Sequence, residues 1–204
     1  MYVAQMGRPR RNFRSESYYH LVNRGVAKRT TYLDDDDYAE FIKLLQIGCY
    51  KYRMDVIAYA LMPNHYHILI QAVQNGNISK CMHWINGNYA KYFNKRYERV
   101  GHLWQDRYFA KEINAGRQLG TVWRYVEQNA CRAKLVSSPE LWPWTSAYIR
   151  ANNMTVSHLI EPSWWGSAIM KEWWSDELLD QATIDKIRRS VQRPSAIKPD
   201  DSWD

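Results

Sequence analysis

The stretch DVIAYALMPNHYHILIQAV, residues 55–73, constrains the fold more than any other part of the chain. Two runs rich in valine, isoleucine, leucine and tyrosine flank the pair Pro63-Asn64, which is typical of a turn. This pattern predicts a β-hairpin with strands over residues 55–62 and 65–73. Because hairpin strands run antiparallel, we expect a sheet that is at least partly antiparallel.

The segments on either side of the hairpin predict further strands and helices. We expect strands over residues 17–24 and 107–113, and helices over residues 34–52, 78–97, 116–133 and near 176–190. Four aspartates stand at the start of the first helix, and Ser79 is a candidate cap of the second. This order predicts an α+β fold, in which helices pack mainly on one face of an antiparallel sheet.

The charge and the aromatic content of the chain favour a polyanionic partner. Its 204 residues carry a formal net charge of +7 and include 10 Trp and 15 Tyr. Basic groups interleaved with aromatic faces suit single-stranded nucleic acid, because every base offers a face on which a ring stacks. The alternative is that the aromatic residues fill the core and the basic residues are solvated.

The cysteines and the apolar segments bear on the cellular compartment. The three cysteines are widely separated and form no C-x-x-C motif, which argues against a disulfide framework and favours a reducing compartment. The N-terminal residues are basic but lack the apolar core of a signal peptide, and no apolar run reaches membrane-spanning length. We therefore expect a cytoplasmic protein that has no contact with a membrane.

Two histidines, His65 and His67, lie in the second strand of the predicted hairpin. Alternate residues of a strand point to opposite faces, so both imidazoles share one face, while Tyr66 and Ile68 share the apolar face. Imidazoles about 7 Å apart along a strand can converge on one divalent ion, but a stable site needs a third ligand from elsewhere. The alternative is a pair of unrelated surface histidines.

The predicted helix over residues 116–133 contains a tyrosine and an asparagine one turn apart. Tyr125 and Asn129 stand at positions i and i+4, so they project from one face of the helix, beside its apolar stripe. If Asn129 supplies the third metal ligand, the Tyr125 hydroxyl lies within reach of the ion, where a nucleophile can attack a polarised phosphate. The alternative is a half-buried tyrosine with a structural role.

Three other tyrosines are followed four residues later by a residue with an oxygen ligand: Tyr148 by Asn152, Tyr19 by Asn23 and Tyr32 by Asp36. The first pair lies in a short segment that ends in loop-like residues. The second lies in a predicted strand, where residues four apart are distant, and the third spans a helix start. Tyr125 is therefore the preferred candidate.

Five segments together resemble a known family: YHLVNRG, ALMPNHYHILI, YAKYFNKRYERVGHLWQDRYFAKEI, WRYVEQNACRA and LWPWTSAY. In this order they resemble the single-tyrosine HUH transposases, and more closely the REP-associated tyrosine transposase branch. The resemblance covers residues 17–150, which we take as the transposase domain, between a basic N-terminal arm (1–16) and a Trp-rich C-terminal extension with a helix and a loose tail (151–204). One departure is Ala130-Cys131, where many relatives carry Pro-Val after the asparagine.

The resemblance implies a ferredoxin-like sheet and an enzyme that cleaves and rejoins single-stranded DNA next to hairpins. His65, His67 and Asn129 would hold Mg²⁺ or Mn²⁺, and Tyr125 would attack the scissile phosphate to form a 5′-phosphotyrosine. Because that bond conserves the energy of the phosphodiester, rejoining needs no nucleotide cofactor, and the sequence contains no G-x-x-x-x-G-K-[ST] loop. The branch also implies a monomer, with a dimer that exchanges tyrosine helices as the alternative.

Basic and polar residues in four segments are candidate DNA contacts, because neutralising phosphates supplies much of the affinity for DNA. They are Arg8, Arg10, Arg11 and Arg14 in the arm, Arg24, Lys28 and Arg29 around the first turn, Lys91, Lys95, Arg96 and Arg99 on or beyond the second helix, and Gln105 and Arg107 at the entrance of the predicted strand over residues 107–113. For each residue the alternative is a solvated surface position. For the segment GHLWQDR it is a packed turn anchored by Trp104.

Two other functions are compatible with these residues. One is a catalytically silent nucleic-acid-binding regulator that occupies hairpin elements. The other is a metal-dependent hydrolase in which water attacks and Tyr125 is only structural. The joint presence of His65, His67, Tyr125 and Asn129 favours the transesterase, because a silent relative could lose any one of them.

Overall fold

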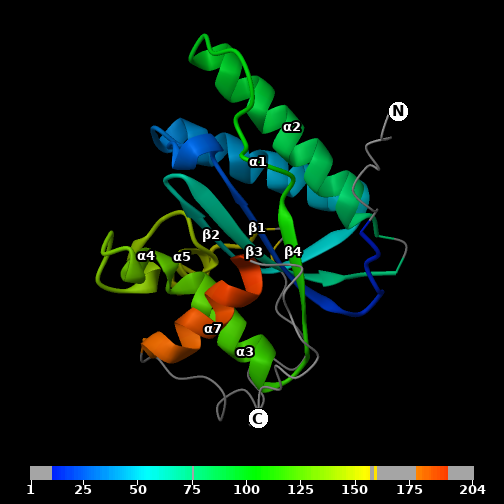
Figure 1. Cartoon of the computed structure of the whole chain (residues 1–204), viewed down its shortest axis with the longest axis vertical. Helices are drawn as coiled ribbons and strands as arrows, with labels where there is room; N and C mark the ends of the chain where they lie inside the picture. Colours follow the sequence, from blue (N-terminus) through cyan, green and yellow to red (C-terminus); the bar gives the residue numbers. More distant parts are fainter. Residues whose placement is uncertain (1–10, 75, 157–158, 160–177, 193–204) are drawn as a thin grey trace, which may run out of the picture.

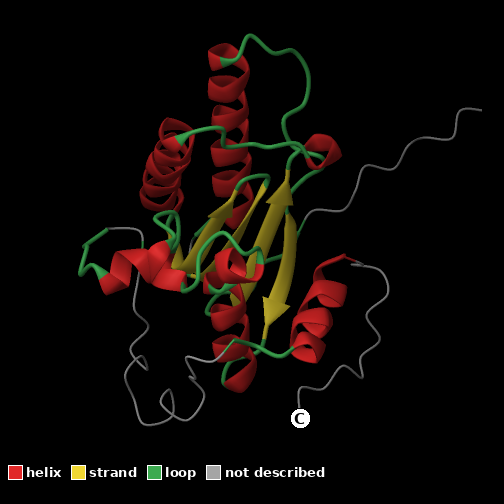
Figure 2. Cartoon of the chain, turned by 90° about the vertical axis from the view of Figure 1, so that its left-hand side faces the viewer, coloured by secondary structure: helices red, strands yellow, loops and turns green. Residues whose placement is uncertain are grey.

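Four strands form one antiparallel sheet in the computed structural model, which describes residues 11–74, 76–156, 159 and 178–192. The sheet has the order β2-β3-β1-β4 (Figures 1 and 2), with β1 (Tyr18–Arg24), β2 (Met54–Met62), β3 (His65–Ala72) and β4 (Phe109–Ile113). The predicted hairpin is confirmed, because β2 and β3 pair antiparallel, from Met62 opposite His65 next to the turn to Met54 opposite Ala72 at the far end. Pro63 and Asn64 form the turn.

Helices α1 (Asp35–Tyr52) and α2 (Ile78–Arg96) connect the strands in the order β-α-β-β-α-β, the arrangement of a ferredoxin-like fold. Both helices begin at a side-chain cap, since the carboxylate of Asp34 accepts a bond from Asp37 N and the amide oxygen of Asn77 accepts one from Lys80 N. The prediction of Ser79 as a cap is wrong, because α2 begins at Ile78 and Ser79 lies inside its first turn. The α+β class is confirmed.

The two long helices cover one face of the sheet (Figure 1). Tyr66, Ile68 and Ile70 of β3 point into this core and are fully buried, as the alternation of the strand predicts. The ring of Phe41 on α1 lies 5.2 Å from that of Tyr66, and the Tyr89 ring of α2 lies 5.2 Å from Phe41. Burying each such side chain contributes about 2 kcal/mol to the free energy of unfolding.

The opposite face of the sheet carries a second core under α3 (Arg117–Glu127) and α7 (Gln181–Gln192). Leu69 of β3, Trp123 of α3 and Ile187 of α7 are buried in it. Helices therefore lie on both faces of the sheet. The two longest, α1 and α2, cover the face of Tyr66 and Ile68, which the sequence predicts to be apolar. The predicted helix over residues 116–133 is divided at Gln128 into α3 and α4 (Asn129–Arg132), and α7 confirms the helix expected near residues 176–190.

Shorter elements complete the described chain: η1 (Val26–Lys28), η2 (Pro139–Leu141) and α5 (Ser146–Ala151). Helix α5 lies beside the edge strand β2, where Ser146 Oγ accepts a hydrogen bond from Tyr59 N at 3.0 Å. Residues 1–10 of the predicted arm, most of the Trp-rich extension and the tail after residue 192 lie outside the described residues. Among the helices that the structure describes, none is both long and apolar enough to cross a membrane.

Candidate functional site

The histidine face of β3 lies against α3, on the side of the sheet away from the two long helices. His65 and His67 both point to this side, with their ring centroids 5.1 Å apart. The neighbouring strand β1 adds His20, whose ring stacks on that of His67 at a centroid distance of 5.0 Å. Three imidazoles therefore gather at one place, although the sequence analysis identified only two of them.

A hydrogen bond orients the ring of His65. Its Nδ1 lies 2.6 Å from the amide oxygen of Asn64, while the Asn64 amide nitrogen donates to the Lys28 carbonyl at 2.9 Å. Because that nitrogen is engaged by a carbonyl, the Asn64 oxygen faces His65 and accepts its Nδ1–H. The Nε2 lone pair of His65 is thereby directed away from the backbone and is available to a metal ion.

His67 has a corresponding partner in His20. His20 Nε2 and His67 Nδ1 lie 2.9 Å apart, and both residues are buried. One nitrogen must donate and the other accept, because two neutral rings share this bond. When His67 donates from Nδ1, its Nε2 lone pair is also available, which is how an outer residue orients a metal-binding imidazole.

Burial keeps the three imidazoles neutral. It lowers the pKa of His20 to about 3 and, together with the positive charge of Arg24, lowers the pKa of His65 to about 4. The pKa of His67 is held well below its ordinary value by burial and by its neighbours His20 and His65. Neutral imidazole is the form that binds metal ions, so the site keeps this form at neutral pH.

Helix α3 places Tyr125 directly against these histidines. The centroid of its ring lies 5.5 Å from that of His67 and 6.0 Å from that of His20, in edge-to-face contacts. Only 4% of Tyr125 is exposed, so the ring is confined. The alternative tyrosines all lie in or against the core beneath α1 and α2: Tyr19, Tyr32 and Tyr148.

Asn129 begins α4, directly after the break at Gln128. Its amide nitrogen donates to the carbonyls of Tyr125 at 2.9 Å and of Val126 at 3.2 Å. These bonds satisfy carbonyls at the end of α3, which have no partner within the helix. With the nitrogen held against the helix end, the Asn129 oxygen is the atom of this amide that is available to a ligand.

Arg132, at the end of α4, lies beside Tyr125. Its guanidinium carbon is 4.3 Å from the centroid of the Tyr125 ring, and its Nη2 donates to the Tyr125 carbonyl. Burial lowers the pKa of Arg132 to about 10, so the side chain still carries its charge at neutral pH. The sequence analysis did not identify this residue.

One open cleft of about 1000 Å³ joins these side chains. His65, His67, Tyr125 and Asn129 all line it, so the structure brings together the four residues that the sequence analysis selected. The wall of the cleft is rich in cations and includes four of the predicted DNA contacts: Arg11, Arg24, Gln105 and Arg107. Two further arginines that were not predicted also line it: Arg132 of α4 and Arg188 of α7.

The loop that carries Gln105 and Arg107 is anchored on two sides. Trp104 Nε1 donates to the Asn86 carbonyl of α2 at 3.0 Å, and Gln105 N donates to the Arg24 carbonyl at the end of β1 at 2.9 Å. The packed turn and the cleft-lining role are therefore compatible, because the anchor at Trp104 holds the two following side chains at the wall.

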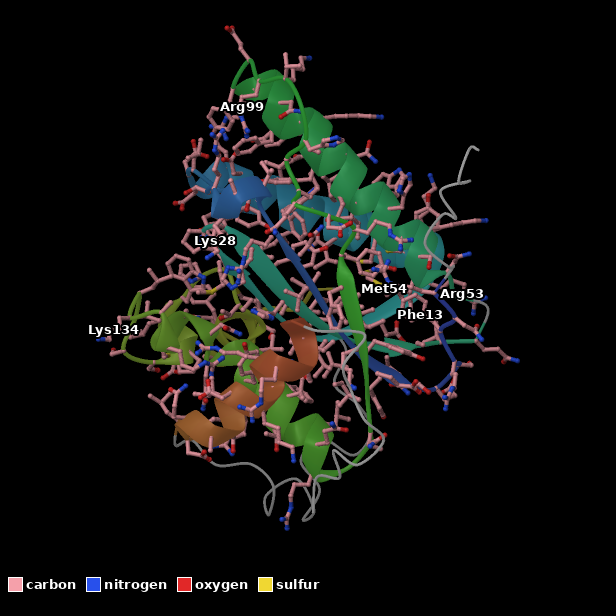
Figure 3. The ribbon with its side chains drawn as sticks, viewed as in Figure 1. Phe13, Lys28, Arg53, Met54, Arg99 and Lys134 are labelled. Carbon is pink, nitrogen blue, oxygen red and sulfur yellow. The ribbon has the colours of Figure 1, made fainter. Side chains whose placement is uncertain are left out.

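The other described candidates for DNA contact do not line this cleft, and their role stays a prediction: Arg14, Lys28, Arg29, Lys91, Lys95, Arg96 and Arg99. Figure 3 shows Lys28 beside the connection that follows β1 and Arg99 beyond the outer end of α2. Arg96 already binds the carboxylates of Asp34, Asp36 and Asp37, so it ties α2 to the start of α1. Arg8 and Arg10 lie outside the described residues.

The donor atoms fit a divalent cation of intermediate hardness. Two imidazoles and an amide oxygen suit Mn²⁺ better than Mg²⁺, which prefers oxygen ligands alone. Within the described part of the chain, no group of three His, Cys, Asp or Glu side chains could hold a metal ion. The three selected ligands, His65, His67 and Asn129, are uncharged, and one carboxylate, that of Asp106, also lines the cleft.

His20 and Arg132 had weak signals in the sequence. The register of β1 and β3 places Val22 opposite His67. His20 lies two residues before Val22, so the side chains of His20 and Val22 point to the same face of the sheet as that of His67. Arg132 follows Tyr125 by two helical turns, which predicts a shared face of a continuous helix. Neither signal is usable without knowing that β1 pairs with β3 and that α3 packs on this face.

A family model described as "Transposase IS200 like" matches residues 13–129, more than half of the 204 residues, and this range contains all four selected residues. The structure of a REP-associated tyrosine transposase bound to a REP hairpin matches with a TM-score of 0.62 and 15% identity, covering 87% of this chain and 96% of that one. This likeness shows the fold.

A putative transposase from Deinococcus radiodurans R1 matches with a TM-score of 0.41 and 15% identity, over 73% of this chain and 100% of that one. No curated protein matches the chain. The extent of the family match, on a ferredoxin-like sheet with the selected residues in one cleft, shows that the chain belongs to the IS200-like transposase family.

Proposed function

We propose that this transposase is a metal-dependent single-tyrosine transesterase that cleaves and rejoins single-stranded DNA beside hairpins. The observation that carries the proposal is the contact of Tyr125 with His67, 5.5 Å between ring centroids, in a cleft that His65 and Asn129 also line. A phenol, two imidazoles and an amide oxygen in one cleft are the groups that a metal-assisted transfer to tyrosine requires. The fold shared with a transposase solved on a REP hairpin supports a hairpin substrate.

In the proposed reaction, Tyr125 Oη forms a bond to the scissile phosphorus while the bond from phosphorus to the 3′ oxygen breaks. The phenol gives up a proton and the departing oxygen takes one up, which leaves a free 3′-OH and a 5′-phosphotyrosine. Rejoining is the reverse attack by a 3′-OH, so no nucleotide is consumed. A bound Mg²⁺ or Mn²⁺, held by His65, His67 and Asn129, would stabilise the charge on the phosphate as a Lewis acid.

The protein contributes chiefly by positioning the nucleophile. The Tyr125 ring is confined by edge-to-face contacts with His20 and His67 and by the guanidinium of Arg132. A confined phenol has lost most of its rotational freedom before the DNA arrives, and this lowers the entropic part of the barrier. The cationic wall of the cleft supplies electrostatic attraction for the strand, which predicts binding that weakens as salt rises.

We also propose that the chain acts as a monomer in the cytoplasm. Tyr125 lies against histidines of its own chain, so the site is complete without a helix from a second copy. The cysteines of the described part, Cys49, Cys81 and Cys131, are free and buried, as is usual in a reducing compartment.

The proposal is tested by incubating the protein with Mn²⁺ and single strands that carry a hairpin with randomised flanks and a 3′ label. A 5′-phosphotyrosine retains the 3′ part of the strand, so a labelled band that migrates with denatured protein is expected. Tyr125→Phe is expected to remove this band and to keep DNA affinity within about twofold, because only one hydroxyl is lost. Tyr148→Phe is the matched control and keeps the band.

The same gel separates the alternatives. Cut DNA without a protein-linked band indicates that water is the nucleophile. DNA that is uncut on this gel but retarded by the protein on a native gel indicates a silent regulator of hairpins. Adduct formation by Tyr125→Phe would refute the assignment of the nucleophile.

A further inference from the structure

The proposed mechanism uses the half-buried guanidinium of Arg132 only to confine the Tyr125 ring, and it leaves the N–H groups of this cation without a role. Arg132 lines the cleft together with Tyr125, His65 and His67, yet its guanidinium makes a single hydrogen bond, from Nη2 to the Tyr125 carbonyl. Its Nε and Nη1 are shielded from solvent and have no hydrogen-bond partner among the residues that the structure describes. An unpaired buried donor costs about 1–3 kcal/mol, and more when it is charged, so such a group calls for an acceptor.

No carboxylate of the described residues pairs with Arg132, whereas the other buried arginine near this face, Arg150, binds Glu127. Another arginine, Arg188, lines the same cleft, and its positive charge disfavours the cationic form of Arg132. Five arginines thus line one cleft, namely Arg11, Arg24, Arg107, Arg132 and Arg188, and Arg188 is only loosely paired with Asp185, at 3.8 Å. One carboxylate, that of Asp106, lines the cleft with these five arginines, so positive charge is in excess there.

Resting on the proposed function, we propose that Arg132 binds the scissile phosphodiester of the DNA strand through one edge of its guanidinium, where an unpaired N–H, of Nε or of Nη1, lies beside the second N–H of Nη2. A guanidinium presents adjacent N–H groups in a planar fork that matches two oxygens of a phosphate. Its position, 4.3 Å from the Tyr125 ring centroid, brings the bound phosphorus next to the phenol that attacks it. Arg132 is then a catalytic residue, because it contacts the substrate and holds the phosphate on the side where Tyr125 lies.

The competing explanation is that Arg132 only holds Tyr125 in place by its cation–π contact. The two roles differ in what they recognise, because a structural clamp does not respond to charge on the substrate. The probe is the dinucleotide dTpdT, which has a single phosphodiester, compared with its methylphosphonate analogue, in which that phosphorus is uncharged. Dissociation constants are measured by NMR titration in EDTA, so that no metal ion contributes.

In the wild-type protein, dTpdT is expected to bind about 10- to 100-fold more tightly than the methylphosphonate, the range for hydrogen bonds to a charged group. In Arg132→Met, which keeps a long side chain without the charge, this ratio is expected to fall to within about threefold of one. Arg189→Met is the matched control, an exposed arginine on α7 outside the cleft, and keeps the wild-type ratio.

A ratio that is unchanged in Arg132→Met overturns the inference, even if that variant binds both dinucleotides more weakly. If Arg132→Met fails to fold, the Nε–H resonance of Arg132 in the wild-type protein decides: it shifts with dTpdT and not with the methylphosphonate, and equal responses overturn the inference. Because this measurement needs no cleavage, its result is independent of whether Tyr125 forms adducts, so failure of the proposed function is recognised separately on the gel.

Discussion

His20 Nε2 and His67 Nδ1 lie 2.9 Å apart across the pairing of β1 with β3, in the floor of the cleft that Tyr125 lines. His20 does not line the cleft, whereas His67, a candidate metal ligand, does. Outer partners of this kind set the tautomer and the orientation of a ligand ring.

Replacing His20 is therefore expected to weaken metal binding without touching a ligand. His20→Ala is expected to reduce Mn²⁺ affinity about 10- to 100-fold, because His67 loses the partner that orients its ring. Electron paramagnetic resonance of free Mn²⁺ measures this directly. His83→Ala, an exposed histidine on α2, is the control and leaves affinity unchanged. Equal affinities in the wild type and His20→Ala would remove His20 from the site.

The metal-free protein is expected to lose stability as the pH falls below about 6.5. His20, His65 and His67 have folded-state pKa values below the ordinary value, so only the unfolded chain takes up their protons between pH 6.5 and about 4. Each histidine then contributes a loss of about 1 kcal/mol between pH 7 and pH 5.5. Urea unfolding in EDTA at these two pH values measures the change, and an unchanged free energy of unfolding would show that the imidazoles titrate freely.

Asn129 is expected to have two separable roles. Asn129→Ala loses both the oxygen ligand and the bonds to the carbonyls of Tyr125 and Val126, so it should weaken Mn²⁺ binding and cost about 1 kcal/mol of stability. Asn129→Asp keeps an oxygen ligand but sets a carboxylate against the same carbonyls, so it is expected to melt at a lower temperature while still binding Mn²⁺. Thermal melts and Mn²⁺ titrations of both variants check this, and a fully stable aspartate variant contradicts it.

The protein is expected to elute as a 24.3 kDa monomer in size exclusion with light scattering. Because Tyr125 contacts His67 of its own chain, a mixture of Tyr125→Phe and His67→Ala proteins is expected to form no adduct. Adducts that appear only in the mixture would show that the tyrosine helix is exchanged between two chains.

The buried pair of Glu127 and Arg150 is expected to hold α3 to α5. The Glu127 carboxylate binds the guanidinium and accepts a bond from Ser146 Oγ at 2.5 Å, while the Arg150 guanidinium lies 4.7 Å from the Trp123 ring centroid. Glu127→Ala strands a buried positive charge and is expected to cost about 3–5 kcal/mol in urea unfolding. Glu112→Ala, which removes a partly exposed carboxylate, is expected to cost less than about 1 kcal/mol.

Local patterns in the sequence determined the elements and the pairs within them. The two-residue period of β3 sent His65 and His67 to one face, and the helical period brought Tyr125 and Asn129 together, because both relations depend only on the neighbouring backbone. The order of strands and helices likewise predicted the α+β class with an antiparallel sheet, whereas the ferredoxin-like arrangement was implied by the family resemblance. These relations are local, so one chain is enough to predict them.

Only the tertiary structure decided which side chains surround these pairs. The pairing of β1 with β3 brought His20 to His67, and the packing of α3 on the histidine face brought Tyr125 to both. Each of these contacts joins segments whose register depends on burying apolar surface across the whole domain. Such non-local packing leaves no periodic trace in the amino-acid order.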